Sequence, residues 1–230
     1  MVNEFNSEGR PRALLLYGGW SGHWPKACAD FAAEHLLDDF RVVRAQNLDV
    51  LRPDVLSEFD LLAPIWTFGE LTNNQEQALL DAVANGLGVL AWHGAASAFL
   101  NSRPHKHMLG GQFVAHPGGA DVTYAVRFLG NDALVAGLQD VTVTTEQYYL
   151  LVDPAVKMLA TTRMHGGPLT WTAGVEMPVA WTRRWGKGKV FYCALGHSLD
   201  VLQQPSIAHL LRRAAGWASR GEVRAIRAAA

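Results

Sequence analysis

The chain has 230 residues, of which 49% are hydrophobic and 18% are charged. This composition excludes an intrinsically disordered protein, because disorder requires low hydrophobicity together with high net charge. The 20 Lys and Arg residues nearly balance the 21 Asp and Glu residues, and no basic run indicates a nucleic-acid-binding surface, so no nucleic-acid partner is expected.

The amino terminus and the two cysteines indicate a cytoplasmic protein. Residues 1–12 contain charged residues and no continuous apolar segment, so they do not resemble a secretory signal, and we expect them to be disordered. No stretch reaches the roughly 18 apolar residues that a membrane helix needs, so no membrane partner is expected. Cys28 and Cys193 lie in apolar stretches, which favours buried free thiols over a disulfide framework.

The first ninety or so residues alternate between expected strands and expected helices. Strands are expected at 13–17, 41–45, 61–66 and 87–92, and the first and last of these are apolar runs. A glycine loop and a helix that begins near Pro25 follow the first strand. Thr72 and Gln75 have the spacing of a capping box ahead of another helix. Because these strands are apolar without alternation, we expect a parallel sheet covered on both faces.

From about residue 121 the pattern changes to closely spaced strands. They are expected at 122–128, 141–151, 156–161, 179–185 and 190–195, with a hairpin turn at Gly186-Lys187-Gly188. A helix is expected from about 206 to 218, and residues 219–230 are expected to form a frayed tail. The predicted fold class is α/β, with a mostly parallel sheet, added late strands and a single domain over residues 13–218.

Four of the nine histidines lie beside or near glycine in predicted loops. His23, His93 and His197 each follow a predicted strand, and His116 follows a Gly-Gly-Gln-Phe segment. Ligands bind outside the carboxyl ends of strands in open parallel sheets, and glycine permits sharp turns and close approach to a ligand. Any one of these histidines could instead cap a helix or bond to backbone, but their shared setting favours a common site.

Two glutamates are further candidates. Glu146 lies in an apolar, strand-like stretch, where an unpaired carboxylate would be costly, so we expect it to be paired or functional. Glu70 follows the third predicted strand and fits a functional acid and a plain exposed residue equally well. His105-Lys106-His107 has the flanks of a short solvated turn and is set aside. The chain has no P-loop, Cys-x-x-Cys, His-Glu-x-x-His or Gly-x-Ser-x-Gly motif.

Several segments occur in an order that resembles a known family. They include Leu-Gly-Gly-Gln-Phe-Val-Ala-His-Pro at 109–117 and the long block at 178–192, together with residues 86–95, 146–149 and 195–197. These segments resemble the trehalose-utilisation (ThuA-like) family, with the similarity running from about residue 13 to 218. The resemblance implies a class I glutamine-amidotransferase-like fold with a flavodoxin-like, doubly wound sheet.

Two positions depart from what the resemblance implies. True amidotransferases of this fold carry a cysteine at the tight turn after a central strand, whereas the matching turn here carries His93. Neither Cys28 nor Cys193 lies at that turn, so thiolate chemistry is not expected. The aspartate that often precedes the family's glutamate is replaced here by Thr145, which argues against a paired-carboxylate role but leaves Glu146 itself in place.

Members of the family are associated with bacterial disaccharide and keto-sugar catabolism. The resemblance therefore implies an enzyme that processes a sugar or keto-sugar by isomerisation, elimination or hydrolysis. Glu146 would act as acid/base, with His93 and His116 as polarising or binding groups. The expected substrate-binding residues are His23, Trp20, Trp66, Glu70, Tyr148 and His197. The alternative is a non-catalytic carbohydrate-binding or regulatory protein on the same scaffold.

The same histidines are compatible with a bound metal cofactor. A divalent metal such as zinc could bind His93, His116 and His197, because a catalytic zinc site typically uses three protein ligands and one open position. Hydrogen bonding to a sugar, without any ion, is the other interpretation of these residues. The expected partner is a small-molecule sugar, and a homo-oligomer is compatible with the sequence.

Overall fold

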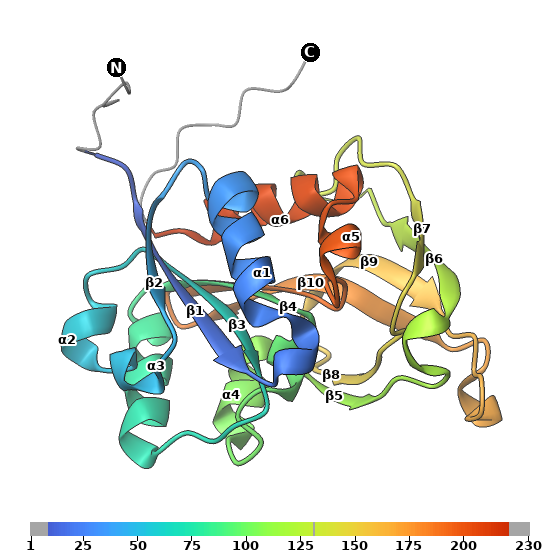
Figure 1. Ribbon diagram of the computed structural model, residues 1–230, viewed down its shortest axis with the longest axis horizontal. Coiled ribbons are helices and arrows are strands. Elements are labelled where there is room, and N and C mark those ends of the chain that lie inside the picture. Colours follow the sequence, from blue (N-terminus) through green and yellow to red (C-terminus); the bar gives the residue numbers. More distant parts are fainter. Residues whose placement is uncertain (1–8, 131, 221–230) are drawn as a thin grey trace.

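The central feature of the fold is a large mixed β-sheet (Figure 1). The computed structural model describes residues 9–130 and 132–220, and within them nine strands form this sheet in the order β2-β1-β3-β4-β11-β10-β9-β6-β7. The parallel strands are β1 (Arg12–Gly19), β2 (Arg41–Ala45), β3 (Leu61–Thr67), β4 (Gly88–Trp92) and β11 (Gly188–Cys193). Their order is the flavodoxin order 2-1-3-4-5, with β11 in fifth place. The predicted flavodoxin-like, doubly wound fold is therefore confirmed.

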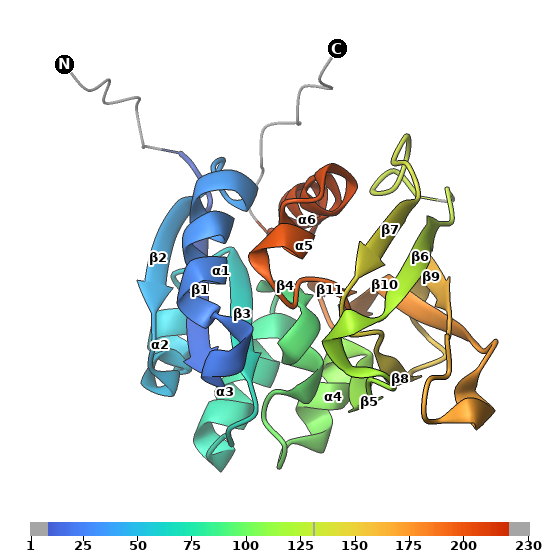
Figure 2. The same cartoon turned by 45° about the vertical axis from the view of Figure 1, so that its right-hand side comes forward.

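The later strands extend this sheet in antiparallel fashion. They are β10 (Glu176–Trp185), β9 (Lys157–Arg163), β6 (Thr123–Phe128) and β7 (Val141–Thr144), joined in that order beyond β11. A separate antiparallel pair is formed by β5 (Gly111–Ala115) and β8 (Tyr149–Val152). Figure 2 shows these added strands on the side of the molecule opposite β2. They occupy the part of the chain between β4 and β11.

Helices cover both faces of the parallel strands (Figure 1). One face carries α1 (Pro25–Phe31), which continues as a π-helical turn to Leu36, with α5 (Leu199–Leu202) and α6 (Pro205–Ala218). The other face carries α2 (Pro53–Leu56), α3 (Asn73–Ala84) and α4 (Arg103–Leu109). Because both faces are covered, β4 is buried at every residue, as its continuous apolar run predicts. No helix in the described ranges has the length and apolar character needed to cross a membrane.

The ends of the described chain contact the sheet. β1 begins at Arg12, Ser219 is buried, and the Arg220 amide donates a hydrogen bond to the Asp60 carbonyl at 3.1 Å. The predicted disordered segment and frayed tail fall for the most part on residues 1–8 and 221–230, which lie outside the described residues.

The strand expected at 141–151 is instead two strands in different sheets. β7 ends at Thr144 and β8 begins at Tyr149, so residues 145–148 cross between them. The crossing residues are buried by side-chain contacts rather than by a strand ladder: the Gln147 amide donates to the Thr162 hydroxyl and to the Arg163 carbonyl, each at 3.0 Å. An apolar, buried segment cannot be distinguished from a strand by its pattern alone, which explains the error.

The segment His105-Lys106-His107, expected as a solvated turn, lies on α4. The Ser102 hydroxyl accepts a hydrogen bond from the His105 amide at 3.0 Å and caps the helix, and Gly110 ends it with a φ of 87°. His105 is buried against the Phe99 ring. The prediction was wrong because serine, proline and glycine mark helix ends as well as turns.

Candidate functional site

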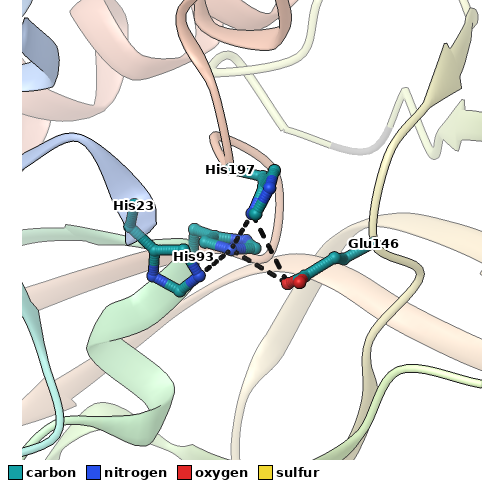
Figure 3. Close-up of side chains that lie close together, drawn as sticks. All are labelled: His23, His93, Glu146 and His197. Atoms are coloured by element: carbon teal, nitrogen blue, oxygen red, sulfur yellow. Dashed lines mark hydrogen bonds and ion pairs between the residues drawn. The ribbon is translucent and has the colours of Figure 1, made fainter. Parts of the chain in front are cut away.

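Four polar side chains meet at the carboxyl ends of the parallel strands (Figure 3). His23 follows β1, His93 follows β4, and His197 follows β11, whereas Glu146 lies in the connection from β7 to β8. One nitrogen or carboxylate oxygen from each residue lies within 4.8 Å of the others. We refer to these four residues as the His/Glu cluster. Sequence reasoning placed all four among the candidate site residues.

The backbone around the His/Glu cluster is shaped to bring these side chains together. His93 has a φ of 42°, in the left-handed region that side chains rarely adopt. At Gly94, a Cβ atom would collide with the Thr67 hydroxyl and lie 2.9 Å from His23 Nδ1. Gly196, directly before His197, has a φ of 114°. The glycines beside the predicted histidines therefore allow the sharp turns and the close packing that the cluster requires.

His93 lies at the centre of the His/Glu cluster. Its Nδ1 lies 3.0 Å from the Ala194 carbonyl, which can only accept, so Nδ1 carries a proton. Its Nε2 lies 3.3 Å from His23 Nε2 and 3.2 Å from His197 Nδ1. The Glu146 carboxylate lies 3.3 Å from the same Nε2 atom.

The two outer histidines of the cluster are held neutral by burial. His23 Nδ1 lies 2.8 Å from the Thr67 hydroxyl at the end of β3. Burial, together with the nearby His93 ring, lowers the pKa of His23 to about 3. Burial and the same neighbour also lower the pKa of His197. Neutral imidazoles present lone pairs that can accept hydrogen bonds or bind a metal ion.

Glu146 is buried and ionised. Burial raises its pKa, but the hydrogen bond with His93 and the electrostatic interactions with the His93, His197 and His116 rings outweigh that effect and lower the pKa to about 2. The Tyr124 hydroxyl donates to the Glu146 backbone carbonyl at 2.9 Å and fixes the connection. The carboxylate is paired, as its apolar sequence context predicts, and it is an anion at neutral pH.

His116 and Tyr148 lie next to the cluster. His116 follows β5, its side chain is 40% exposed, and its Nε2 lies 3.8 Å from Glu146 Oε1. The Tyr148 ring is buried and stacks on His93, with its hydroxyl 2.9 Å from His93 Nε2. One oxygen of Glu146 thus faces the cluster, while the other faces the more exposed His116.

Exposed aromatic side chains surround the cluster. Trp20 and Trp24 are 46% and 54% exposed, and their rings lie 4.7 Å from His23 and 5.8 Å from His197, respectively. Phe68 is also exposed and lies 6.0 Å from the Trp20 ring. We call Trp20, Trp24 and Phe68 the aromatic rim.

Trp66 and Glu70, which were also predicted to bind substrate, are neither part of the His/Glu cluster nor of the aromatic rim. Trp66 is half-buried and packs against Phe99, and it lines a small cavity with His23 and His93. Glu70 is exposed, and within the described residues no hydrogen bond or ion pair joins it to the cluster.

Sequence reasoning missed three residues of the site. Thr67, which orients His23, is the last residue of β3, so its place at a strand end was visible in the sequence. Trp24 and Phe68 adopt φ values of 43° and 62°, and these aim their rings outward. No sequence pattern indicates such a conformation for an aromatic residue.

The fold and the cluster define a flavodoxin-like α/β protein with a histidine- and glutamate-rich site at the carboxyl ends of its parallel strands. The family model for ThuA, described as trehalose utilisation, matches residues 12–218. The chain therefore belongs to the trehalose-utilisation (ThuA) family, which relates it to carbohydrate processing. The resemblance seen in the sequence is confirmed.

Solved structures share the whole fold at low sequence identity. A ThuA-like protein from Parabacteroides merdae is 18% identical with a TM-score of 0.75, and the match covers 93% of this chain and 91% of that chain. A ThuA-like protein from Bacteroides uniformis is 18% identical with a TM-score of 0.72, covering 94% and 93%. A cytoplasmic protein from Salmonella typhimurium is 12% identical with a TM-score of 0.64, covering 91% and 100%. No curated protein matches the sequence. At these identities the likeness shows the fold alone.

Proposed function

We propose that this protein is an enzyme that processes a sugar or keto-sugar in carbohydrate catabolism, by isomerisation, elimination or hydrolysis. The observation that carries the proposal is the buried, ionised Glu146 carboxylate among His23, His93 and His197, at the sheet edge where α/β proteins bind ligands. Family membership supports a carbohydrate substrate.

The chemistry of a keto-sugar fits these groups. A C–H bond next to a carbonyl is acidic, and a positioned carboxylate or imidazole can remove its proton. An imidazole N–H, such as one from the exposed His116, can polarise the carbonyl while negative charge develops on its oxygen, whereas His93 already donates its Nδ1 proton to the Ala194 carbonyl. Glu146 is ionised, so it can accept a proton or orient His116 but cannot begin as the proton donor at neutral pH. His116 is exposed and faces the free carboxylate oxygen, which suits it to exchange protons with a bound sugar.

The aromatic rim supports carbohydrate binding. Sugar rings present apolar C–H faces that pack on exposed aromatic rings, while their hydroxyls need polar partners such as those of the cluster. Trp20 belongs to the rim, and Tyr148 and Trp66 lie beside the histidines. Glu70 would contact only a substrate that extends along the surface beyond the cluster.

The second candidate function is non-catalytic sugar binding or regulation. It is favoured by the same aromatic rim, because stacking and hydrogen bonding bind a sugar without any reaction. The two functions differ in one measurable respect: both predict sugar affinity by calorimetry, but only the enzyme predicts a product. A cytoplasmic location belongs to the proposal and is supported by the Salmonella neighbour; a homo-oligomeric state is a further expectation.

The test is incubation of the purified protein with 3-keto-disaccharides and their parent sugars, followed by product analysis. We expect turnover of at least one of these compounds, and we expect Glu146→Gln to lower it by about 100-fold or more, because proton transfer by a positioned group contributes about 10²- to 10⁴-fold. Glu34→Gln, at an exposed glutamate on the π-helical turn after α1, is the matched control and should retain the rate. Sugar binding without any product would favour the non-catalytic alternative.

A further inference from the structure

The spacings within the His/Glu cluster suit a metal site as well as hydrogen-bonded pairs. His93 Nε2 lies 3.3 Å from His23 Nε2, 3.2 Å from His197 Nδ1 and 3.3 Å from Glu146 Oε2. His197 Nδ1 and Glu146 Oε2 are 3.6 Å apart. In a tetrahedral zinc site, the bonds from zinc to nitrogen and oxygen ligands are about 2.0–2.2 Å long. The ligand atoms of such a site therefore lie roughly 3.3–3.6 Å from one another. Three of these four spacings fall within the range expected for the edge of a zinc tetrahedron and the fourth, at 3.2 Å, is slightly shorter, while all pairs of the cluster lie within 4.8 Å.

The Tyr148 hydroxyl lies 2.9 Å from His93 Nε2 and can donate to it, but His23 Nε2, His197 Nδ1 and the Glu146 carboxylate also gather around the same atom. Because Nδ1 donates to the Ala194 carbonyl, Nε2 of a neutral ring presents a lone pair. The Glu146 carboxylate is an acceptor and has no proton to offer that lone pair. A proton on Nε2 could satisfy only one of the neighbouring groups. A cation among the four residues would bind the lone pairs and the carboxylate together.

The surroundings of the cluster orient its members as ligands. The Ala194 carbonyl fixes Nδ1–H of His93, and the Thr67 hydroxyl can accept from Nδ1 of His23, so Nε2 of both rings is free to bind a metal. Such outer partners of metal-bound histidines set the tautomer and the direction of the ring. The Tyr148 hydroxyl also lies within reach of Glu146, so it retains an acceptor when a metal takes the His93 lone pair.

We propose that His23, His93, His197 and Glu146 bind one divalent transition-metal ion. Three imidazole nitrogens and one carboxylate oxygen suit zinc and its first-row neighbours, whereas magnesium and calcium require mostly oxygen ligands. His23 takes the place that the sequence prediction gave to His116, whose ring nitrogen lies on the far side of the carboxylate, facing Oε1. His116 stays free of the ion and keeps its proposed role in proton exchange.

The experiment is metal analysis of protein purified without a histidine tag, then zinc titration by calorimetry after treatment with a chelator. We expect one equivalent of zinc per chain. His197→Gln and Glu146→Gln should each weaken zinc binding by at least about tenfold, the lower end of the loss seen when even a supporting residue of a metal site is removed. His116→Gln is the matched control, a nearby histidine outside the cluster, and should still bind one equivalent.

Cobalt substitution gives a second measurement that does not depend on activity. A four-coordinate site gives intense visible absorption with Co²⁺, and Glu146→Gln should change that spectrum while His116→Gln should not. Less than about a tenth of an equivalent of zinc in folded protein, both before and after addition of zinc, would overturn the proposal. Equal loss of zinc affinity in the His116→Gln and His197→Gln variants would also overturn it.

The experiments distinguish failure of the metal-site proposal from failure of the proposed enzymatic function. Zinc binding at the cluster without turnover of any sugar would leave the metal site standing and count against the enzyme. Turnover by protein that binds no zinc would support the enzyme and remove the metal.

Discussion

Cys28 and Cys193 are both buried and free, and the Cys28 thiol donates to the His23 carbonyl at 3.5 Å. Burial raises the pKa of Cys28 to about 11 and that of Cys193 to about 12, so neither forms the thiolate that a nucleophile requires. At the turn after β4, where amidotransferases of this fold place their cysteine, the chain instead has His93, held at a φ of 42°. Strain of this kind costs about 1–3 kcal/mol and occurs most often at functional sites. The residue at this turn therefore has imidazole chemistry in place of thiol chemistry.

We predict that both thiols are inert in the native protein. A thiol reagent at pH 8 should leave native Cys28 and Cys193 unmodified and should modify both after unfolding in guanidinium, because only the thiolate reacts. The double variant Cys28→Ser, Cys193→Ala should retain any turnover and any zinc binding of the parent protein. Rapid labelling of the native chain, or a folded double variant without activity, would contradict the prediction.

At the scale of the elements, the connection between β7 and β8 has the greatest consequence for the site. β7 belongs to the main sheet and β8 pairs with β5, so the chain must leave one sheet and enter the other between Thr144 and Tyr149. This crossing carries Glu146 to the edge where the parallel strands end. A single continuous strand would have fixed Glu146 in a ladder and would have left the three histidines without a carboxylate.

Helix α3 offers a local test of the fold. The Thr72 hydroxyl accepts from the Gln75 amide at 3.3 Å, and the Gln75 side chain accepts from the Thr72 amide at 2.9 Å. This reciprocal arrangement confirms the capping box predicted from the sequence.

Thr72→Ala should lower the free energy of unfolding by about 1 kcal/mol, which for a chain of this size lowers Tm by roughly 2–4 °C in a thermal scan. Asn73→Ala, one residue later, removes no cap and serves as control. Equal stability of the two variants would contradict this role for the cap.

The elements that could be predicted from the sequence are those with a local signal. The continuous apolar runs of β1, β3 and β4 and the capping box of α3 depend on neighbouring residues, and both were predicted correctly. The break between β7 and β8 depends on contacts of Gln147 with β9, which are distant in the sequence. For the site, glycine beside histidine was a local signal, whereas Trp24 and Phe68 were missed because a positive φ at an aromatic residue has no sequence pattern.

At the scale of the whole molecule, the parallel strands and the strands added between β4 and β11 contribute different residues to the site. The parallel strands supply His23, His93 and His197 from three strand ends, at the edge where the strand order allows a ligand crevice. The strands added between β4 and β11 supply Glu146 and His116. The site is complete only where the two sets of strands meet, so its geometry depends on correct assembly of the entire sheet.

Acid sensitivity of the whole fold is expected from His105, which lies on α4 and lines a small internal cavity together with residues of the parallel strands. It is 2% exposed, and its Nδ1 has no hydrogen-bond partner. Burial, with a smaller contribution from Lys106, lowers its pKa to about 3. The unfolded chain binds a proton at this residue below about pH 6.5, whereas the folded chain does not, so stability falls as the pH falls through that value.

We predict that the free energy of unfolding, measured by urea titration, decreases between pH 7.5 and pH 5, and that His105 accounts for about 2 kcal/mol of the decrease. In the His105→Leu variant, the free energy of unfolding should fall by about 2 kcal/mol less over the same pH interval, because leucine takes up no proton in the unfolded state. His23, whose pKa is also lowered by burial, remains in both proteins, so its contribution cancels in the comparison. His209→Leu, at an exposed position on α6, controls for the loss of one histidine. If wild type and His105→Leu lose stability in parallel over this interval, His105 is charged in the folded protein and the prediction is wrong.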